Sequence, residues 1–486
     1  MDEVGISQIK GKIISGVFAL STRTLILQII AFTATFFLTI LLSPSVFGVF
    51  FVVSAVISFL SYFSDIGLAA ALIQKKDELT RDELVTAFTI QQILVGIIVI
   101  SILFISPAIA KFYSLENGGL FLMHAMVISF FISSLKTIPS ILLERKLEFK
   151  SLIIPQILET GTFYIVAIIL ALLGRGVESF AWAAILRGII GLVAIYIISP
   201  WRISFGISKT AAVHLLSFGT PFQANSILAL IKDDLITIFL GKILPLNQVG
   251  YIGWAKKWAE VFLRLIMDSV IRVTFPAFSR LQKNKKILSV AIEKTLFFLA
   301  LFIFPTTTIF VLYIKPLIAV IPRYIKWEPA LFSFYLFSFS SVWAAFSSPL
   351  VNALNAVGKI KVTLVLMLIW TLLTWILVPL FTRQFGFNGV AIASFIISFT
   401  GFMPFILMKK VISFRIIRPI SKPVVATIIV AIPIYLILHI QQTIAAIFIS
   451  CVLGVLIYCA ITWFWMKDEI APYLPARLVG PPKIKQ

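Results

Sequence analysis

Apolar runs of about 20 residues recur along this chain from one end to the other. Each run is long enough to cross roughly 30 Å of hydrocarbon as a helix. Because no water is present there to bond backbone N–H and C=O groups, and because the runs are too long for barrel strands, the spans must be helices. The chain is therefore predicted to be an all-α polytopic membrane protein. Its hydrophobic content of 60% agrees, since soluble domains lie nearer about 45–50%.

Fourteen spans are predicted. They are residues 13–42, 46–73, 84–110, 119–143, 152–173, 177–199, 211–240, 248–278, 288–314, 329–356, 362–381, 389–408, 424–440 and 444–466. With the N-terminus in the cytoplasm, the cytoplasmic segments hold 25 Lys and Arg residues and the external loops hold 7. Positive charge prefers the cytoplasmic side, so we expect both termini inside and a multi-pass location in the cytoplasmic (inner) cell membrane.

The remaining global features exclude several classes. The net charge is +21, which cationic loops facing an anionic inner leaflet explain without a nucleic-acid partner. No cleavable signal is expected, because the first apolar run is too long for one. Cys451 and Cys459 lie in one apolar run and are expected to pack rather than pair. No Cys, His, Asp and Glu combination has metal-ligand spacing, so we expect neither metal nor cofactor.

Turns of similar chemistry recur in the two halves of the chain. Residues 42–48 join spans one and two, and residues 244–250 join spans seven and eight, 202 positions later. Residues 174–177 and 386–390 correspond in the same way. We therefore predict two pseudo-symmetric six-helix bundles, residues 1–209 and 210–410, followed by a C-terminal helix pair and tail in residues 411–486. Coincidence between Gly/Pro turns is the alternative.

The eighth predicted span carries a charge at every fourth position. Lys256, Glu260, Arg264, Asp268 and Arg272 alternate in sign, and residues four apart are neighbours on a helix. Four residues advance the helix by about 400°, so the ladder drifts by about 40° per rung. Glu260, Arg264 and Asp268 can therefore share a polar lumen, whereas Lys256 and Arg272 point toward a neighbouring helix or an interface. A stripe that neutralises itself is the alternative to a set of ligands.

Spans seven and eight form a hairpin around Pro245. Asp233 lies twelve residues before this centre and Lys257 twelve after it, so Asp233 or Asp234 is expected at the depth of Lys256 or Lys257. An interhelical ion pair is predicted there. It is either a structural neutralisation or a coupling or gating element.

Several cations within the spans have no acid three or four residues away. These are Arg23, Lys136 and Arg187, while Arg264 has only its ladder partners. Cations on several helices predict an anionic ligand, because an arginine fork binds phosphate bidentately. These four residues form the predicted substrate-binding lumen, although Arg23 and Lys136 could instead snorkel to the cytoplasmic face. Glu159 is a further acid within the spans. The predicted coupling or gating set comprises Asp65, Asp233, Asp234, Lys256, Lys257, Glu260, Asp268 and Arg272.

Several short motifs resemble a known family. They are residues 11–48 with Ser21-Thr22-Arg23 and Leu42-Ser43-Pro44, Asp65-Ile66-Gly67-Leu68, Ser134-Leu135-Lys136-Thr137-Ile138-Pro139, residues 145–150, Ser199-Pro200-Trp201-Arg202 and residues 272–282. In order and spacing the chain resembles Wzx-type polysaccharide transporters of the multidrug/oligosaccharidyl-lipid/polysaccharide (MOP) exporter superfamily. The likeness covers roughly residues 11–285 and continues beyond them only in pattern. Ser45-Val46 departs from it, because an acidic pair is expected there.

The resemblance implies a MATE-like, V-shaped pair of bundles that open alternately to each side. The cargo would be an oligosaccharide on a polyprenyl (pyro)phosphate, flipped during the biosynthesis of a cell-surface polysaccharide such as lipopolysaccharide. Fourteen spans suit the polysaccharide and lipid II flippase branches. The resemblance also makes Arg272 a structural or gating residue. Membrane lipids, Na⁺ or H⁺ as coupling ion and other polysaccharide-assembly proteins are the implied partners.

Two other functions compete with this one. A cation-coupled exporter of drugs or small metabolites would favour an acid-dominated cavity, whereas cations outnumber acids here. A membrane glycosyltransferase or polymerase usually needs a sizeable extramembrane loop with catalytic groups. The longest external loop, residues 315–328, holds one acid. The chain is therefore predicted not to be an enzyme, and no catalytic residue is assigned.

Overall fold

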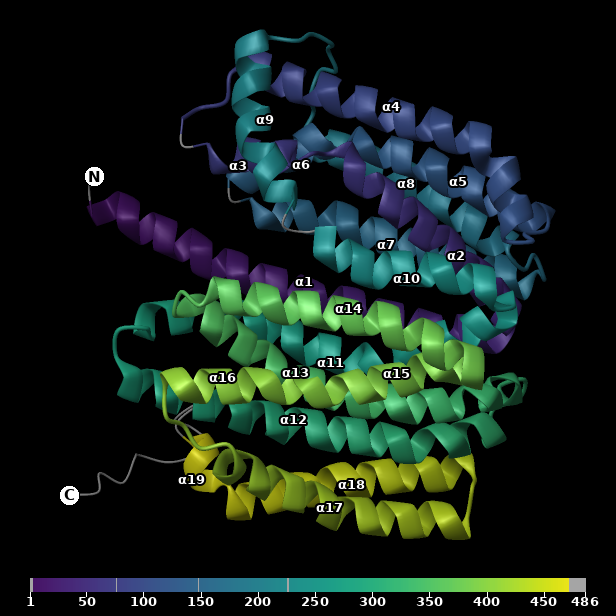
Figure 1. Ribbon diagram of the computed structural model, residues 1–486, viewed down its shortest axis with the longest axis vertical. Coiled ribbons are helices and arrows are strands. Elements are labelled where there is room, and N and C mark those ends of the chain that lie inside the picture. The colour runs from purple at the N-terminus through teal and green to yellow at the C-terminus, as the bar shows by residue number, and fades with distance from the viewer. Residues whose placement is uncertain (1–2, 76, 147, 225–226, 472–486) are drawn as a thin grey trace. The chain divides into compact units, whose positions relative to one another are not determined.

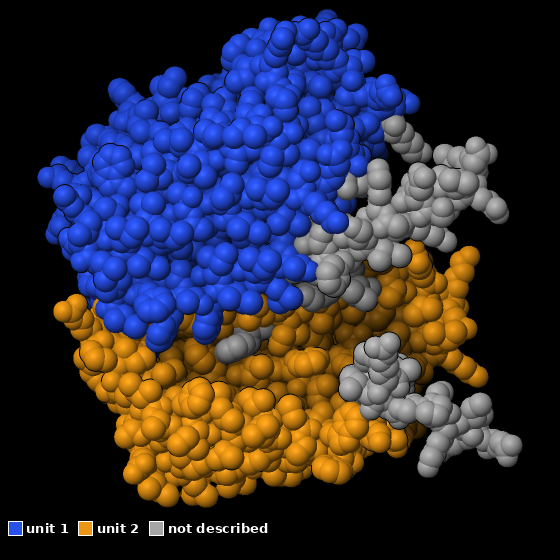
Figure 2. Space-filling view, turned by 180° about the vertical axis from the view of Figure 1, so that it is seen from behind, with its two compact units in different colours: residues 1–254, 370–389 blue, residues 255–369, 390–486 orange. Residues whose placement is uncertain are grey.

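The computed structural model describes residues 3–75, 77–146, 148–224 and 227–471. Every regular element in these ranges is a helix, which confirms the predicted all-α class (Figure 1). The chain divides into two compact units, which Figure 2 colours separately. Unit 1 is Met1–Trp254 with Trp370–Gly389, and unit 2 is Ala255–Ile369 with Val390–Gln486.

Unit 1 contains the helices of the first half of the chain. They are α1 (Glu3–Leu41), α2 (Pro44–Ser61), the 3₁₀ helix η1 (Tyr62–Ser64), α3 (Leu68–Gln74), α4 (Arg81–Phe112), α5 (Asn117–Ser134), α6 (Thr137–Arg145), α7 (Phe149–Leu172), α8 (Glu178–Ile198), α9 (Lys209–Ala224) and α10 (Ile227–Ile243). The first turns of α11 (Leu246–Leu281) and the second half of α14 (Ile360–Phe385) also belong to it.

Unit 2 holds the rest of α11 and α14 and the C-terminal helices, apart from the first two residues of α15. The latter are α12 (Lys285–Val320), η2 (Ile325–Ala330), α13 (Leu331–Ala356), α15 (Asn388–Ser398), η3 (Phe399–Phe402), α16 (Met403–Val411), α17 (Ile417–Ile440), α18 (Ile444–Trp465) and α19 (Lys467–Ile470). α17 and α18 pack on each other and on α12 (Figure 1). The Tyr313 hydroxyl of α12 donates to Ser450 Oγ of α18 at 2.9 Å. The predicted C-terminal helix pair is therefore present in unit 2.

Twelve of the described helices are long and apolar enough to cross a membrane. Two further spans are expected at residues 211–240 and 248–278, where the described helices are not among these twelve. The first is described as α9 and α10, with 16 and 17 residues, on either side of residues 225–226. The second is α11, a 36-residue helix that carries the charge ladder. The count of fourteen stays a prediction.

The units do not follow the predicted bundle boundaries, because α9 packs on α3 and α4 and α10 packs on α2. Leu215 of α9 is fully enclosed in a core with residues of α3, α4 and α6. Helices from beyond residue 209 are thus built into unit 1. The division by sequence symmetry stays a prediction.

Two expected spans are broken inside unit 1, and a charged residue lies at each break. After η1, Ile66 and Gly67 have φ values of 45° and 75°, and the side chain of Asp65 accepts a hydrogen bond from Ala69 N at the start of α3. The other break separates α5 from α6 at Lys136, which precedes the first residue of α6. Interrupted helices free backbone groups that need new partners, and in membranes they occur where protein or a watery cavity supplies them.

The turns at 42–48 and 244–250 face each other inside unit 1. A Cβ on Gly48 would lie 1.7 Å from Leu246 O, and a Cβ on Gly250 would lie 1.9 Å from Pro44 O. Residue 246 corresponds to residue 44 in the repeat, and residue 250 corresponds to residue 48. Position 48 of the first turn thus meets the equivalent of position 44 in the second turn, and the reverse contact is also present. A two-fold relation between the turns produces such a reciprocal pair of contacts. It supports the repeat read from the sequence.

Candidate functional site

A cluster of three charged side chains joins three segments of unit 1. Lys136 Nζ lies 2.5 Å from Glu159 Oε1, and Arg187 Nε lies 3.8 Å from Glu159 Oε2. The lysine and the carboxylate side chains are each only 13% exposed, whereas that of Arg187 is 52% exposed. We call these residues the Glu159 cluster. It carries two positive charges against one negative charge.

Each member of the cluster is placed by its helix. Glu159 lies near the middle of α7, and Arg187 lies near the middle of the neighbouring α8. Lys136 reaches the carboxylate from the break between α5 and α6. Arg187 also stands 6.0 Å from the centroid of the Phe163 ring, one helical turn beyond Glu159 on α7. At mid-helix in an apolar protein, a cation is costly unless protein or water surrounds it.

Gly191 of α8 makes room for the carboxylate. A Cβ at this position would lie 2.2 Å from Glu159 Oε1 and 2.4 Å from its Cδ. Any larger residue would therefore push the carboxylate aside. The cluster depends on a small residue on the helix that also provides Arg187.

The third predicted lumen residue of unit 1, Arg23 on α1, acts electrostatically on another acid. Burial raises the pKa of the Glu144 carboxyl on α6, and the positive charge of Arg23 partly opposes that rise. Arg23 is half-buried. No acid lies three or four residues from Arg23, Lys136 or Arg187 in sequence, but the fold brings Glu159 of α7 to Lys136 and Arg187.

The predicted gating acids of unit 1 have separate environments. The side chain of Asp65 accepts a hydrogen bond from Ala69 N in the first turn of α3. Asp234 accepts a hydrogen bond from Ser58 Oγ of α2 at 3.2 Å, while Asp233 is exposed. The predicted partners of these acids, Lys256 and Lys257, belong to unit 2, so the ion pair between the two hairpin arms stays a prediction.

The charge ladder is described in part. Arg264 Nη2 donates to Glu260 Oε2 at 2.9 Å, which confirms pairing across one helical turn for this rung. The arginine side chain is 69% exposed and that of Glu260 is 21% exposed. Lys256 and Lys257 are exposed on the same helix. The side chains of Asp268 and Arg272 lie outside the described residues, so their predicted roles stay predictions.

Glu159 is the member of the candidate site that the sequence pattern did not single out. It is an acid within a predicted span, but the predicted binding and gating residues come from the cations and from the charge ladder. The hairpin argument used for spans seven and eight applies equally to α7 and α8. Glu159 lies sixteen residues before Arg175, which is in the turn, and Gly191 lies sixteen after it. That register places the acid opposite the glycine that accommodates it.

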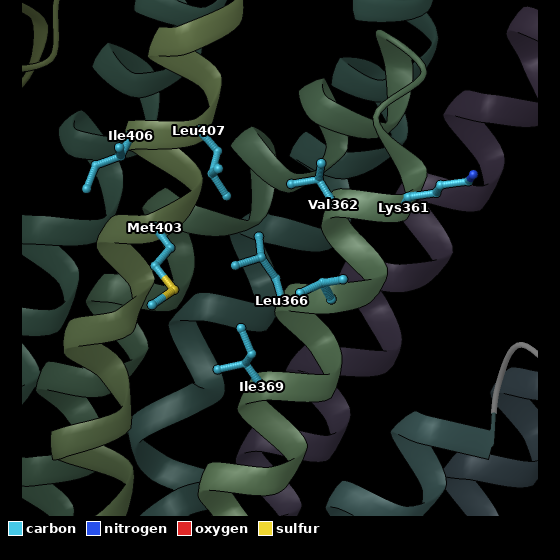
Figure 3. A pocket seen from close by; sticks show the side chains of 8 residues that line it. Lys361, Val362, Leu366, Ile369, Met403, Ile406 and Leu407 are labelled. Carbon is cyan, nitrogen blue, oxygen red and sulfur yellow. The ribbon is translucent and has the colours of Figure 1, made fainter.

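A cavity elsewhere has different chemistry. It measures about 480 Å³ and lies in unit 2 between α14 and α16. Val362, Leu366 and Ile369 face Met403 and Leu407 across it, and the amine of Lys361 extends away from it (Figure 3). Its apolar lining offers nothing to an anion. Among the described residues, no group of three or more His, Cys, Asp or Glu is placed to hold a metal ion.

Comparison with solved structures defines the class of this fold. The structure is similar to the lipid II flippase MurJ in an inward closed conformation, with a TM-score of 0.74 at 16% identity over 93% of this chain and 99% of that one. It is also similar to an inward-facing multidrug resistance MATE family transporter of the MOP superfamily, with a TM-score of 0.61 at 17% identity over 79% of this chain and 95% of that one. The chain thus has the fold of MOP superfamily membrane transporters.

The sequence comparison narrows the class to a family. The model of the polysaccharide biosynthesis protein family matches residues 37–331, more than half of the chain. The chain belongs to this family, as the resemblance predicted.

Two relatives illustrate the family. The succinoglycan biosynthesis transport protein ExoT of Rhizobium meliloti (strain 1021) is 23% identical over 54% of this chain and 55% of its own length. The teichuronic acid biosynthesis protein TuaB of Bacillus subtilis (strain 168) is 26% identical over 46% of this chain and 45% of its own. The chain spans about half the length of each relative in these matches.

Proposed function

We propose that this protein is a flippase that moves an oligosaccharide linked to a polyprenyl (pyro)phosphate across the cytoplasmic membrane during the biosynthesis of a cell-surface polysaccharide. Alternating access of its bundles would carry the head group while the lipid tail stays in the bilayer. Membership of the polysaccharide biosynthesis family supports this, as does the similarity to a solved lipid II flippase. The observation that carries the proposal is the Glu159 cluster.

The chemistry of the cluster suits such a cargo. Sugars are neutral or weakly charged, so the (pyro)phosphate is the part that needs electrostatic compensation. The guanidinium group of an arginine and the ammonium group of a lysine supply this compensation. The attraction of each cation for the phosphate is stronger where water is scarce. With two cations and one acid, the cluster has a net positive charge in the middle of apolar helices. Arg23 is proposed to extend this cationic surface within unit 1, and Arg264 of unit 2 is proposed as a further substrate-binding residue.

Several finer features belong to the same proposal. Both termini lie in the cytoplasm, Na⁺ or H⁺ supplies the coupling, and other polysaccharide-assembly proteins receive the cargo. Asp65, Asp233, Asp234 and the charges of α11 from Lys256 to Arg272 are proposed to take part in coupling or gating. No catalytic step is assigned to the protein.

A second candidate function is the cation-coupled export of drugs or small metabolites. The similarity to a multidrug MATE transporter favours it. The excess of cations in the cluster opposes it, because a cationic drug would be repelled there. Transport of an organic cation by the purified protein would favour this alternative.

The test is translocation of a labelled polyprenyl-linked glycan in proteoliposomes. We expect the wild-type chain to expose the glycan to an external lectin or hydrolase, and the single variants K136M, R187M, R23M and R264M to slow this, K136M and R187M most. For a residue that binds a phosphate, a loss of about tenfold or more is the expected scale. No translocation by wild type would reject the proposed function, and unchanged rates in all four variants would reject the cationic site.

A further inference from the structure

Glu159 holds the two cations that the proposed cargo would need. Lys136 is in direct contact with one oxygen of its carboxylate, and Arg187 lies 3.8 Å from the other oxygen. An anionic head group cannot take over the Lys136 amine while the carboxylate is in direct contact with it, although the N–H groups of the exposed Arg187 stay accessible. Either the head group binds elsewhere or the carboxylate leaves.

We propose that Glu159 is an internal counterion that occupies the anion site when it is empty and that the (pyro)phosphate displaces on binding. The inference rests on the proposed function and assigns to this site a competition between an internal and an external anion. Release of the cargo is then assisted by the return of the carboxylate. In the empty site the carboxylate compensates the cations. In the occupied site its return helps to release the phosphate.

The geometry on each side of Glu159 fits an exchange better than a permanent bridge. The distance of 3.8 Å from Arg187 is too long for a hydrogen bond, and this arginine is 52% exposed, so its N–H groups stay accessible. Lys136 has an unbranched stem that can follow either anion. A diphosphate carries more charge than one carboxylate and has oxygens enough to contact both cations at once.

Gly191 gives a way to move the carboxylate without changing any charge. A Cβ there would overlap the Oε1, Cδ and Cγ atoms of Glu159, which belong to the end of a flexible side chain. In the variant G191A the carboxylate must therefore shift, while the added methyl group meets neither Lys136 nor Arg187 among its nearest neighbours. A purely structural bridge would only be weakened by this change, but a competing counterion would be removed from the site.

The experiment measures binding of farnesyl pyrophosphate to the purified full-length chain in detergent, with farnesol as the uncharged control. Kd and the ligand-induced rise of the unfolding temperature are both recorded. If the carboxylate occupies the cations about 90% of the time, its removal tightens the apparent Kd about tenfold. We expect this for E159Q, a smaller tightening for G191A, and a weakening for K136M and R187M. E178Q is the matched control, since Glu178, the first residue of α8, forms an exposed pair at 3.8 Å with Arg175 of the preceding turn.

The outcomes separate the inference from the function. Tighter binding in E159Q and G191A, with E178Q unchanged, supports displacement. Unchanged or weaker binding in both variants, or no binding preference for the pyrophosphate in any of the chains, overturns it. The proposed function is judged independently by translocation of the lipid-linked glycan by the wild-type chain, which can succeed when the binding result fails. If E159Q unfolds, G191A alone decides the inference.

Discussion

Two ion-paired regions of this molecule differ in how the chain builds them. The Glu260–Arg264 pair on α11 joins residues one helical turn apart, and its arginine is 69% exposed. The Glu159 cluster joins α7, α8 and the break before α6, and its lysine and carboxylate are each 13% exposed. One pair needs only a helix, whereas the other needs the tertiary fold of unit 1.

The difference has an energetic consequence. An exposed pair contributes about 0–1 kcal/mol, because solvent already stabilises each charge. Charges withdrawn from water depend on one another, so removal of one member leaves an uncompensated charge at a cost of about 3–5 kcal/mol. The α11 pair can therefore be altered with little effect on the fold. The Glu159 cluster loses stability when its acid is removed, unless another anion takes its place.

The largest expected effect is that of Glu159→Leu. This variant keeps a side chain of similar size but leaves Lys136 with neither a carboxylate nor a polar atom in its place. We expect the free energy of unfolding to fall by about 3–5 kcal/mol. Unfolding in mixed detergent micelles measures it, with Glu260→Leu as the matched variant on α11. A loss below about 1 kcal/mol for Glu159→Leu would put the two regions in the same energetic class.

An intermediate effect is expected where the fold brings backbones together without charge. In Gly250→Ala, the added Cβ would meet Pro44 O, a backbone atom that cannot rotate away. Overpacking of this kind costs about 1–3 kcal/mol. Gly48→Ala, its counterpart in the repeat, should lose a similar amount, and the same unfolding measurement compares them. A loss in one variant and none in the other would argue against a two-fold relation between the two turns.

These regions also explain which parts of the structure the sequence could predict. The helical class follows from apolar run length alone, and the Glu260–Arg264 contact follows from a spacing of four residues. The Gly48 and Gly250 contacts follow indirectly, since a repeat 202 residues apart marks both turns. All three depend on local geometry or on self-similarity within the chain.

The Glu159 cluster could not be predicted in the same way. Its members come from positions 136, 159 and 187, and no local rule relates them. The helix breaks at Asp65 and Lys136 also lie within apolar runs that the sequence predicts as single spans. A hydropathy pattern reports that a segment is apolar but not where its backbone bends. The register of the α7–α8 hairpin was the one available signal, and it places Glu159 opposite Gly191.

The smallest expected effect is that of exchanging the α11 charges in the double variant E260R/R264E. The swap keeps an opposite pair at the same spacing, although the order with the acid first is slightly better on a helix. We expect the free energy of unfolding to change by no more than about 0.5 kcal/mol, and any change to shrink as salt is added. The corresponding swap K136E/E159K should behave differently, because it sets a second positive side chain against Arg187 in a place with little solvent. Equal tolerance of the two swaps would show that the depth of the Glu159 cluster does not matter. A large loss of unfolding free energy in K136E/E159K alone would instead show that the Glu159 cluster depends on the tertiary fold of unit 1, whereas the Glu260–Arg264 pair depends on one helix.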